Sequence, residues 1–380
     1  MKNIIPYGRQ NINDSDKKAV YKTLSNKLIT TGEEVNKFEN SLKNYLKCKF
    51  VTVCNSGTSA IFLALSAINL KENDIIIMPA LNFIASYNMA SFFKVKIYFA
   101  DVDEKTGQVT PESILECIKK NNLSKVKGII IMYNGGYPEN VEGFHKLKRK
   151  FNCFIIEDAC HALGSKYILN KKKFKIGSCN HCDISTFSLH PLKTITTGEG
   201  GIVTTNSKKF DNKIKLIRSH GIKRTKDHWN YNVLIPGFNF RLNDFQSSLG
   251  ISQLKRIEKF IERRKKVSNL YDKYLKKIDE IDFIDYKNHN FSSFHLYIVH
   301  LKKDKKKFLR YMLKKKIMIQ HHYTPVYKFS FFNKKLKLKK TENYYKSAVS
   351  LPIYYDLNTK NQIFIIKSIY QFFKKKFIKI

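Results

Sequence analysis

Apolar residues recur in short, nearly continuous runs along the first two thirds of the chain. The runs are rich in Ile, Val and Phe, and the segments between them carry apolar residues at helical spacing. Strands that are apolar at successive positions are typical of a largely parallel sheet covered by helices on both faces. The sequence therefore predicts an α/β fold with strands at residues 50–53, 75–78, 96–99, 128–132, 153–156, 184–187 and 201–204.

Two helices are predicted ahead of the first strand. Asn13-Asp-Ser-Asp16 supplies N-cap residues for a helix over residues 17–24. Residues 33–46 place their apolar side chains at helical spacing and predict a second helix.

The pattern changes beyond residue 250, where helices and single strands alternate without a repeated unit. We predict a large α/β domain at residues 15–250 and a smaller α+β domain at residues 251–380, completed by residues 1–14. The second domain is expected to contain a helix at 252–275, a strand at 294–299, a helix at 305–314, a strand at 317–320 and a helical tail.

The composition indicates a folded protein with a strongly basic surface. Hydrophobic residues make up 43% of the 380-residue chain, so a large core is expected. The chain carries 70 Lys and Arg against 31 Asp and Glu, a formal net charge of +39. A nucleic-acid-binding or regulatory protein is a distant alternative on this ground. Lysine runs throughout the chain favour a compositional bias of solvated faces, with no nucleic-acid partner.

Neither a metal site nor a membrane anchor is predicted. Seven cysteines at irregular spacing include one C-x-x-C pair, Cys179 and Cys182, whereas a zinc site needs a second pair of ligands. The start of the chain lacks an apolar signal segment, so free thiols in a reducing cytoplasm are expected. The uncharged run between Asp74 and Lys94 is interrupted by Pro, Asn and Ser, which argues against a membrane span.

One lysine differs from the others in its surroundings. Lys193 follows a Ser-Leu-His-Pro turn and precedes a Thr/Gly-rich segment, where burial lowers a lysine pKa and favours the neutral amine. Asp158 ends an apolar strand, at the edge where ligands bind in open α/β sheets. This pair suggests pyridoxal 5'-phosphate (PLP), with Lys193 as the Schiff-base lysine and Asp158 beside the pyridinium nitrogen. His161 is a candidate contact to the ring or its oxygen; the alternative is a surface histidine.

Further segments suit an anionic, aromatic ligand. The Asn55-Ser-Gly-Thr-Ser59 turn lies between a strand and a helix start, where free amides favour a phosphate, and Ser188 is a second phosphate donor. Phe83 follows a strand and would either stack on a ring or join the core. The loop that contains Asn239 and Arg241 is either a structural turn or a segment that reaches an active site, perhaps that of a neighbouring subunit.

Five motifs in this order resemble the DegT/DnrJ/EryC1/StrS nucleotide-sugar aminotransferases, and the resemblance covers nearly the whole chain. The family has the aspartate-aminotransferase fold (PLP fold type I). Two departures are Met132, where a polar residue is frequent, and Cys160, where a small residue is usual. The motifs are Asn-Ser-Gly-Thr-Ser (55–59), Glu-Asp-Ala-x-His-Ala-Leu-Gly-Ser (157–165), Phe-Ser-x-His-Pro-x-Lys-x-x-Thr-Thr-Gly-Glu-Gly-Gly (187–201), Arg-Ser-His-Gly (218–221) and Asn-Phe-Arg-Leu-Asn (239–243).

The resemblance implies a role for each candidate residue. Lys193 and Asp158 would be catalytic, with His161 against the cofactor ring. A homodimer with shared active sites is implied, because Asn239 would reach the neighbour's phosphate with help from Arg241. The other implied contacts are Gly57, Thr58 and Ser188 to the phosphate, Phe83 to the cofactor, and Tyr7 and Tyr323 to the sugar nucleotide.

Within the family, residues 5–13, 248–255, 295–297, 322–327 and 350–352 are most similar to members that act in pseudaminic acid synthesis. That likeness implies transfer of an amino group from glutamate to C4 of a UDP-4-keto-6-deoxy-N-acetylhexosamine. The same chemistry on another dTDP-, GDP- or UDP-linked keto sugar is the alternative.

Overall fold

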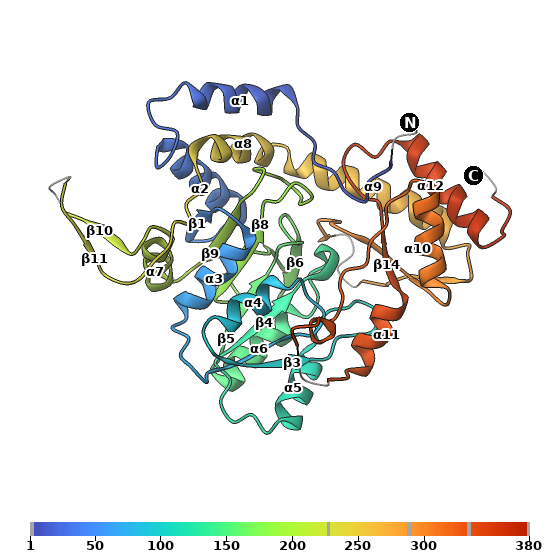
Figure 1. The fold of residues 1–380 in the computed structure, drawn as a ribbon, viewed down its shortest axis with the longest axis horizontal. Helices are drawn as coiled ribbons and strands as arrows, with labels where there is room; N and C mark the ends of the chain where they lie inside the picture. Colours follow the sequence, from blue (N-terminus) through green and yellow to red (C-terminus); the bar gives the residue numbers. More distant parts are fainter. Residues whose placement is uncertain (1–3, 226–228, 287–290, 333–335, 378–380) are drawn as a thin grey trace.

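A seven-stranded sheet forms the centre of the molecule in the computed structural model, which describes residues 4–225, 229–286, 291–332 and 336–377 (Figure 1). The strand order is β1-β9-β8-β5-β4-β2-β3. The strands are β1 (Phe50–Cys54), β2 (Ile75–Pro79), β3 (Lys96–Ala100), β4 (Gly128–Met132), β5 (Phe154–Asp158), β8 (Ile184–Ser188) and β9 (Gly201–Thr205).

The sheet is parallel except for β9, which runs antiparallel to both of its neighbours, β1 and β8. A loop over residues 189–200 turns the chain back after β8, so β9 returns beside it. This arrangement confirms the predicted, mostly parallel α/β fold. The reversal of β9 was not predicted, because an apolar run carries no information on strand direction.

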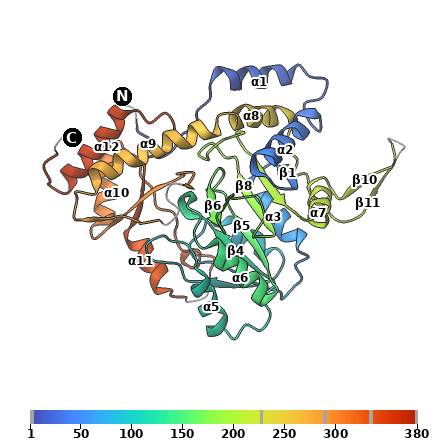
Figure 2. The same cartoon turned by 180° about the vertical axis from the view of Figure 1, so that it is seen from behind.

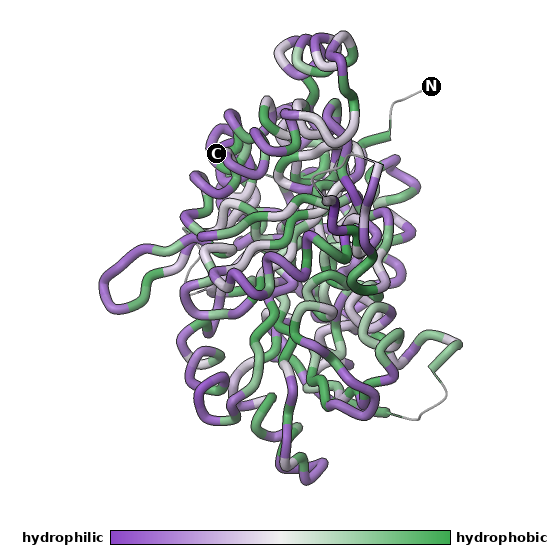
Figure 3. The backbone as a smooth tube through the Cα atoms, turned by 90° about the vertical axis from the view of Figure 1, so that its left-hand side faces the viewer, coloured by the Kyte–Doolittle hydropathy of each residue, from purple (hydrophilic) through white to green (hydrophobic). Residues whose placement is uncertain are grey.

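Helices cover both faces of the sheet. Because successive strand residues point to opposite faces, Ile130 and Ile156 pack on one side, while Ile129 and Ile155 pack on the other. Hydrophilic segments gather at the periphery (Figure 3). The first face is covered by α3 (Gly57–Ala67), α4 (Ala85–Ser91) and α7 (Lys208–Arg218), and the second by α2 (Glu33–Leu46), α5 (Pro111–Lys120) and α6 (Val141–Phe151).

The N-terminal helices form as predicted. Helix α1 (Asp14–Leu24) begins with a capping box, in which Asn13 and Asp16 exchange hydrogen bonds between side chain and backbone. It lies along α8 (Asp244–Leu254) in both views (Figures 1 and 2). The Asp244 carboxylate accepts the N–H groups of Gly32 and Glu34 and so caps α2 from a distant part of the chain.

The C-terminal part has its own apolar cluster around a three-stranded antiparallel sheet. Ile5 joins this cluster and pairs with Ile317, so the start of the chain lies on the C-terminal part. The domain boundary near residue 250 stays a prediction. The elements here are β12 (Ile281–Asp282), β13 (Tyr297–Leu301), β14 (Ala348–Leu351), α9 (Ile257–Leu275), α10 (Lys305–Lys314), α11 (Lys339–Ser347), α12 (Thr359–Phe372) and a 3-10 turn at Val326–Lys328.

Two predicted elements of this part are wrong. The helix at 252–275 is broken between α8 and α9, where the Arg256 side chain turns to bond Asn11 and Asp16. The strand at 317–320 is absent, because residues 317 and 320 make isolated pairs with Ile5 and Ser350 only. The strand predicted from 294 begins at Tyr297, since Phe294 has a left-handed backbone.

Two hairpins were not predicted, and the first of them is lysine-rich. Strands β6 (Lys166–Leu169) and β7 (Lys172–Lys175) form one, and β10 (Ile222–Arg224) and β11 (Tyr231–Val233) form the other. The second hairpin projects from the body, at the end opposite the two termini (Figure 1). Among the described residues, no helix is both long enough and apolar enough to span a bilayer.

Candidate active site

Three strands of the sheet end at the same edge and open onto one cavity of about 400 Å³. Strand β1 leads into the start of α3, β5 ends at Asp158, and β8 leads into the loop that carries Lys193. The carboxyl edge of a parallel sheet is where α/β proteins bind ligands. Nine of the predicted site residues line this cavity: Tyr7, Gly57, Thr58, Phe83, Asp158, His161, Ser188, Lys193 and Tyr323.

Lys193 lies in the tight loop between β8 and β9. Its N–H donates to the His190 carbonyl at 2.9 Å, and the Thr196 hydroxyl and Thr197 N–H both donate to the Leu189 carbonyl. Burial lowers the pKa of the Lys193 amine, while nearby Cys160 and Asp158 act in the opposite direction. The loop therefore presents a part-buried amine whose neutral form is favoured relative to that of an exposed lysine.

Asp158 lies on the α3 and α4 side of the sheet. Its carboxylate accepts the Ser86 hydroxyl at 2.9 Å and the Cys160 N–H at 3.3 Å. The Ser86 hydroxyl in turn accepts a bond from the Asn82 amide at 3.2 Å. Asp158 is 3% exposed, so these donors hold a buried carboxylate that faces the cavity.

The preceding residue, Glu157, points to the opposite face of β5. Its carboxylate accepts hydroxyl groups from Tyr133 and Ser185. Burial raises the pKa of Glu157. Glu157 joins β4, β5 and β8 beneath the site, and it does not line the cavity.

His161 has a partner at each ring nitrogen. Nδ1 accepts the Gly135 N–H at 3.3 Å, so the neutral ring carries its proton on Nε2, which lies 2.8 Å from the Tyr323 hydroxyl. Burial lowers the pKa of His161 well below its usual value, with further contributions from Lys193 and His322. His161 is thus a buried, neutral hydrogen-bonding group and not a surface histidine.

Besides His190 of the lysine motif, His295 and His322 line the cavity, and sequence reasoning gave these two no role. The ring of His295 lies 4.1 Å from that of His161, centroid to centroid. Nδ1 of His322 lies 2.9 Å from the Ser350 hydroxyl, and burial lowers the pKa of His322 to about 3. Both lie in segments that resembled the family, but isolated histidines there gave no sign that the chain folds them over Lys193.

The first turn of α3 lies against β8 at the cavity wall. Ser56 caps the helix by accepting the Ser59 N–H, which leaves the amides of Gly57 and Thr58 at the cavity wall. A Cβ on Gly57 would lie 2.8 Å from the Cβ of Ser188, so only glycine allows this close approach. Helix amides and the Ser188 hydroxyl therefore converge as the sequence predicted.

The remaining predicted site residues do not share one location: some line the cavity and others lie outside it. Phe83 is 54% exposed, and its ring lies 5.9 Å from that of Tyr323, so it belongs to the cavity mouth rather than the core. Tyr7 lies 5.9 Å from the His322 ring, also centroid to centroid. Asn239 and Arg241 do not line the cavity.

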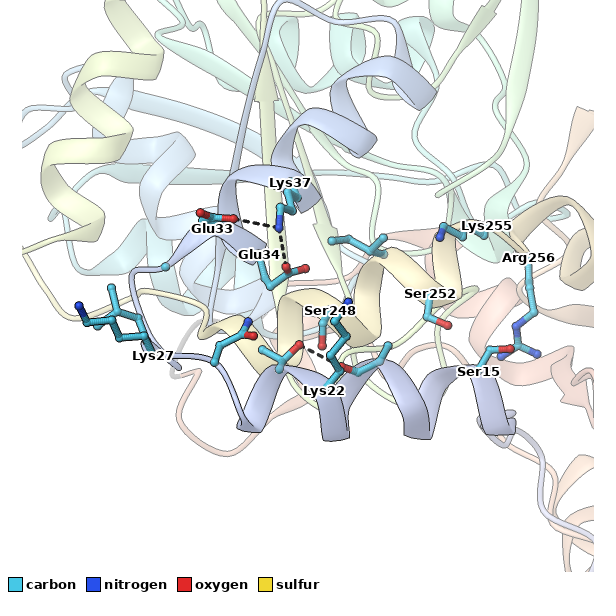
Figure 4. Close-up of a pocket in the computed structure, with 16 residues that line it drawn as sticks. Ser15, Lys22, Lys27, Glu33, Glu34, Lys37, Ser248, Ser252, Lys255 and Arg256 are labelled. Carbon is cyan, nitrogen blue, oxygen red and sulfur yellow. Dashed lines mark hydrogen bonds and ion pairs between the residues drawn. The ribbon is translucent and has the colours of Figure 1, made fainter.

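A larger groove of about 780 Å³ lies between α1, α2 and α8 (Figure 4). Among its charged side chains, Lys37 pairs with Glu33 and Glu34. None of the predicted site residues lines it. The chemistry is therefore concentrated in the smaller cavity.

A family model described as the DegT/DnrJ/EryC1/StrS aminotransferase family matches residues 10–370. The chain belongs to this family. A relative from Campylobacter jejuni (strain 81-176), named UDP-4-amino-4,6-dideoxy-N-acetyl-beta-L-altrosamine transaminase, is 36% identical over 98% of each chain. A Helicobacter pylori protein of the same name is 33% identical over 97% of each chain.

A solved aminotransferase structure has the same fold. The structure of Helicobacter pylori PseC, described as an aminotransferase involved in the biosynthesis of pseudoaminic acid, superposes with a TM-score of 0.89 at 30% identity. The match covers 98% of this chain and 100% of that one. The predicted family and fold are confirmed, and the chain is an aminotransferase; the roles of individual residues stay predictions.

Proposed function

We propose that the chain is a PLP-dependent aminotransferase that moves the amino group of glutamate to C4 of a UDP-4-keto-6-deoxy-N-acetylhexosamine. The observation that carries the proposal is the shared cavity of Lys193 and Asp158, beside the N-terminus of α3. The sugar is inferred from the printed names of relatives in Campylobacter and Helicobacter.

The residues of the cavity fit PLP. Gly57, Thr58 and Ser188 offer amide and hydroxyl donors for its phosphate, at a wall that only a glycine leaves open. Asp158 is a buried carboxylate for the pyridinium nitrogen, and Lys193 is the amine for the aldehyde carbon. When bound, PLP supplies an electron sink for the carbon that loses its proton.

The side chains around this position divide the remaining work. The Lys193 amine takes the proton from the donor α-carbon and later delivers one to C4 of the sugar, which requires its neutral form first. Ser86 and the Cys160 N–H orient Asp158. His161 stays neutral and holds Tyr323 through Nε2, which keeps a phenol group at the cavity wall.

A second copy of the chain would complete the phosphate site. Asn239 is exposed, and both Asn239 and Arg241 lie outside their own cavity, which supports contact with a neighbouring site. Strand β11 of the projecting hairpin and the residues after it carry large apolar side chains that are 44–54% exposed: Tyr231, Val233, Leu234 and Phe238. Such exposed apolar groups favour burial against another protein surface.

Amination of a GDP-linked keto sugar is the second candidate. It is favoured by a relative from Escherichia coli O157:H7 named GDP-perosamine synthase, which is 28% identical over 98% of this chain and 99% of its own length. Both candidates use the same amino-transfer chemistry and differ in the nucleotide and sugar that they bind.

The test combines a substrate panel with one matched pair of lysine variants. The protein, PLP and glutamate are mixed with UDP-, dTDP- and GDP-linked 4-keto sugars, and 2-oxoglutarate and the aminated sugar are measured by NMR. Lys193→Ala should lower turnover by about 10²–10⁴-fold or more, as expected for loss of a positioned proton carrier. Lys305→Ala is the control, since burial also lowers the pKa of Lys305, to about 8, but Lys305 does not line the cavity. Equal activity of both variants would reject the catalytic role of Lys193. A preference for GDP-sugars would reject the UDP-sugar assignment.

A further inference from the structure

Arg264 is a buried arginine of α9 that bonds only to backbone carbonyls in the described chain. Its side chain is 3% exposed, and Nη1 donates to the carbonyl oxygens of Ile353 at 2.9 Å and His295 at 3.3 Å. Nη2 donates to the carbonyl oxygen of Leu192 at 3.4 Å. No carboxylate pairs with it among the residues that the structure describes. A buried cation without a counter-ion is costly, so this position calls for an explanation.

The bonded carbonyls belong to segments that build the active site. The Leu192 carbonyl is part of the peptide group whose N–H, that of Lys193, donates to the His190 carbonyl. Arg264 and His190 thus bond the C=O and the N–H of the peptide group between Leu192 and Lys193, which fixes the backbone that carries the Lys193 side chain.

The second segment carries His295. Its N–H donates to the Gly135 carbonyl, and the Gly135 N–H donates to Nδ1 of His161. Arg264 therefore bonds, on one side, the loop that presents the lysine and, on the other, the segment whose ring packs on His161. One guanidinium joins two walls of the cavity that come from distant parts of the chain.

We propose that Arg264 is a positioning residue that holds the Lys193 amine in place through the Leu192 carbonyl while the C-terminal segments close the site. The expected effect of Arg264 on kcat rests on the proposed function. Arg264 bonds the Ile353 and Leu192 carbonyls through two nitrogens of a rigid fork, whereas a lysine at this position keeps the charge on a single nitrogen and loses that geometry.

The neighbouring Arg263 provides a matched control. Its Nε donates to the Tyr355 carbonyl at 3.3 Å, and its Nη2 donates to the Leu357 carbonyl. Both acceptors lie in the C-terminal part, and Arg263 does not line the cavity. Arg263→Met thus removes similar hydrogen bonds from the same helix without touching the Lys193 loop.

The experiment compares Arg264→Met, Arg264→Lys and Arg263→Met by kinetics and by labelling without the cofactor. We expect kcat of Arg264→Met to fall about 10–100-fold, with KM for the sugar nucleotide within about twofold, because a small displacement of a reacting group is enough. Arg263→Met should keep kcat within about twofold at a comparable loss of Tm. In the apoprotein, acetic anhydride should acetylate Lys193 at a changed rate relative to Lys305 in both Arg264 variants, and at the wild-type ratio in Arg263→Met.

Each result decides the proposal separately from the proposed function. Wild-type kcat and wild-type labelling in Arg264→Lys would overturn it, and this holds even if Arg264→Met does not fold. The proposal would also be overturned if activity fell in proportion to the loss of Tm, and to the same extent, in Arg264→Met and Arg263→Met. If the wild-type enzyme aminates no sugar, the proposed function fails, whereas the apoprotein labelling still tests Arg264.

Discussion

Burial and charge act in opposite directions on the pKa of Lys193. Burial lowers it, and Asp158 and Cys160 raise it, with burial the larger effect. The neutral amine is therefore available at a lower pH than in an exposed lysine, whose pKa is about 10.5.

This balance predicts the pH dependence of the free Lys193 amine in the apoprotein. The rate of its acetylation should rise with pH as Lys193 loses its proton, and the midpoint should lie below 10.5. In the apoprotein, Asp158→Asn removes a negative charge that favours the ammonium form, so the midpoint should fall further. Acetylation of Lys193 followed by mass spectrometry between pH 6 and 11 measures both midpoints. A midpoint at the value of exposed lysines, or one that rises in Asp158→Asn, would contradict this account.

At the scale of single residues, the sequence predicted those site residues that lie in a local motif with distinctive neighbours in the chain. Lys193, Asp158 and Gly57 belong to this group, and all three line the cavity. His295, His322 and Arg264 were given no role, because their functions depend on partners far away in the chain. A buried arginine bonded to carbonyls leaves no trace in sequence spacing.

Among the elements, the junction of α3 with β8 leaves no room for added volume at Gly57. A methyl group on Gly57 would lie 2.8 Å from the Cβ of Ser188 and 3.3 Å from its Cα. The start of α3 would have to move away from β8, and its amides would move away from Ser188.

We therefore expect Gly57→Ala to weaken PLP binding and to lower stability by about 1–3 kcal/mol, the cost of overpacking. Gly128→Ala in β4 is the matched control, since its Cβ would meet the end of the flexible Ile76 side chain at 3.2 Å, away from the site. PLP titration and thermal unfolding of both variants provide the measurement. Equal PLP affinity in the two variants would exclude the α3 amides as the phosphate site.

The predicted elements failed where local pattern and long-range contact disagree. Residues 252–275 have one helical pattern, yet the Arg256 side chain bonds Asn11 and Asp16 where the helix breaks. The hairpin of β6 and β7 carries lysines at most exposed positions, so it lacks the apolar alternation of a strand. The buried strands of the main sheet were predicted well because their runs are apolar on both faces.

For the whole molecule, the decisive question is whether two chains share each active site. The proposed assembly places Lys193 and Asn239 of one site on different chains. Two inactive variants should then restore each other when they are mixed.

Lys193→Ala and Asn239→Ala, unfolded and refolded together in equal amounts, should regain about a quarter of the wild-type activity, because half of the dimers are hybrids with one intact site. Refolding each variant alone is the control. Activity that equals the sum of the separate variants would mean that each chain forms its own site. Sedimentation measures the oligomeric state of the same samples.

The pairing of β1 with β9 also has a consequence for how the chain folds. The first strand of the sheet in the chain finds its partner only at residues 201–205, and the Asn55 N–H bonds the Phe240 carbonyl. During synthesis, the apolar strand β1 therefore stays without its partner β9 while most of the sheet emerges from the ribosome. Contacts between such distant segments slow folding and expose the chain to aggregation. The same geometry brings the turn at residues 55–59 next to the loop at residues 189–200. The nascent chain therefore needs protection from aggregation until both segments have been synthesised.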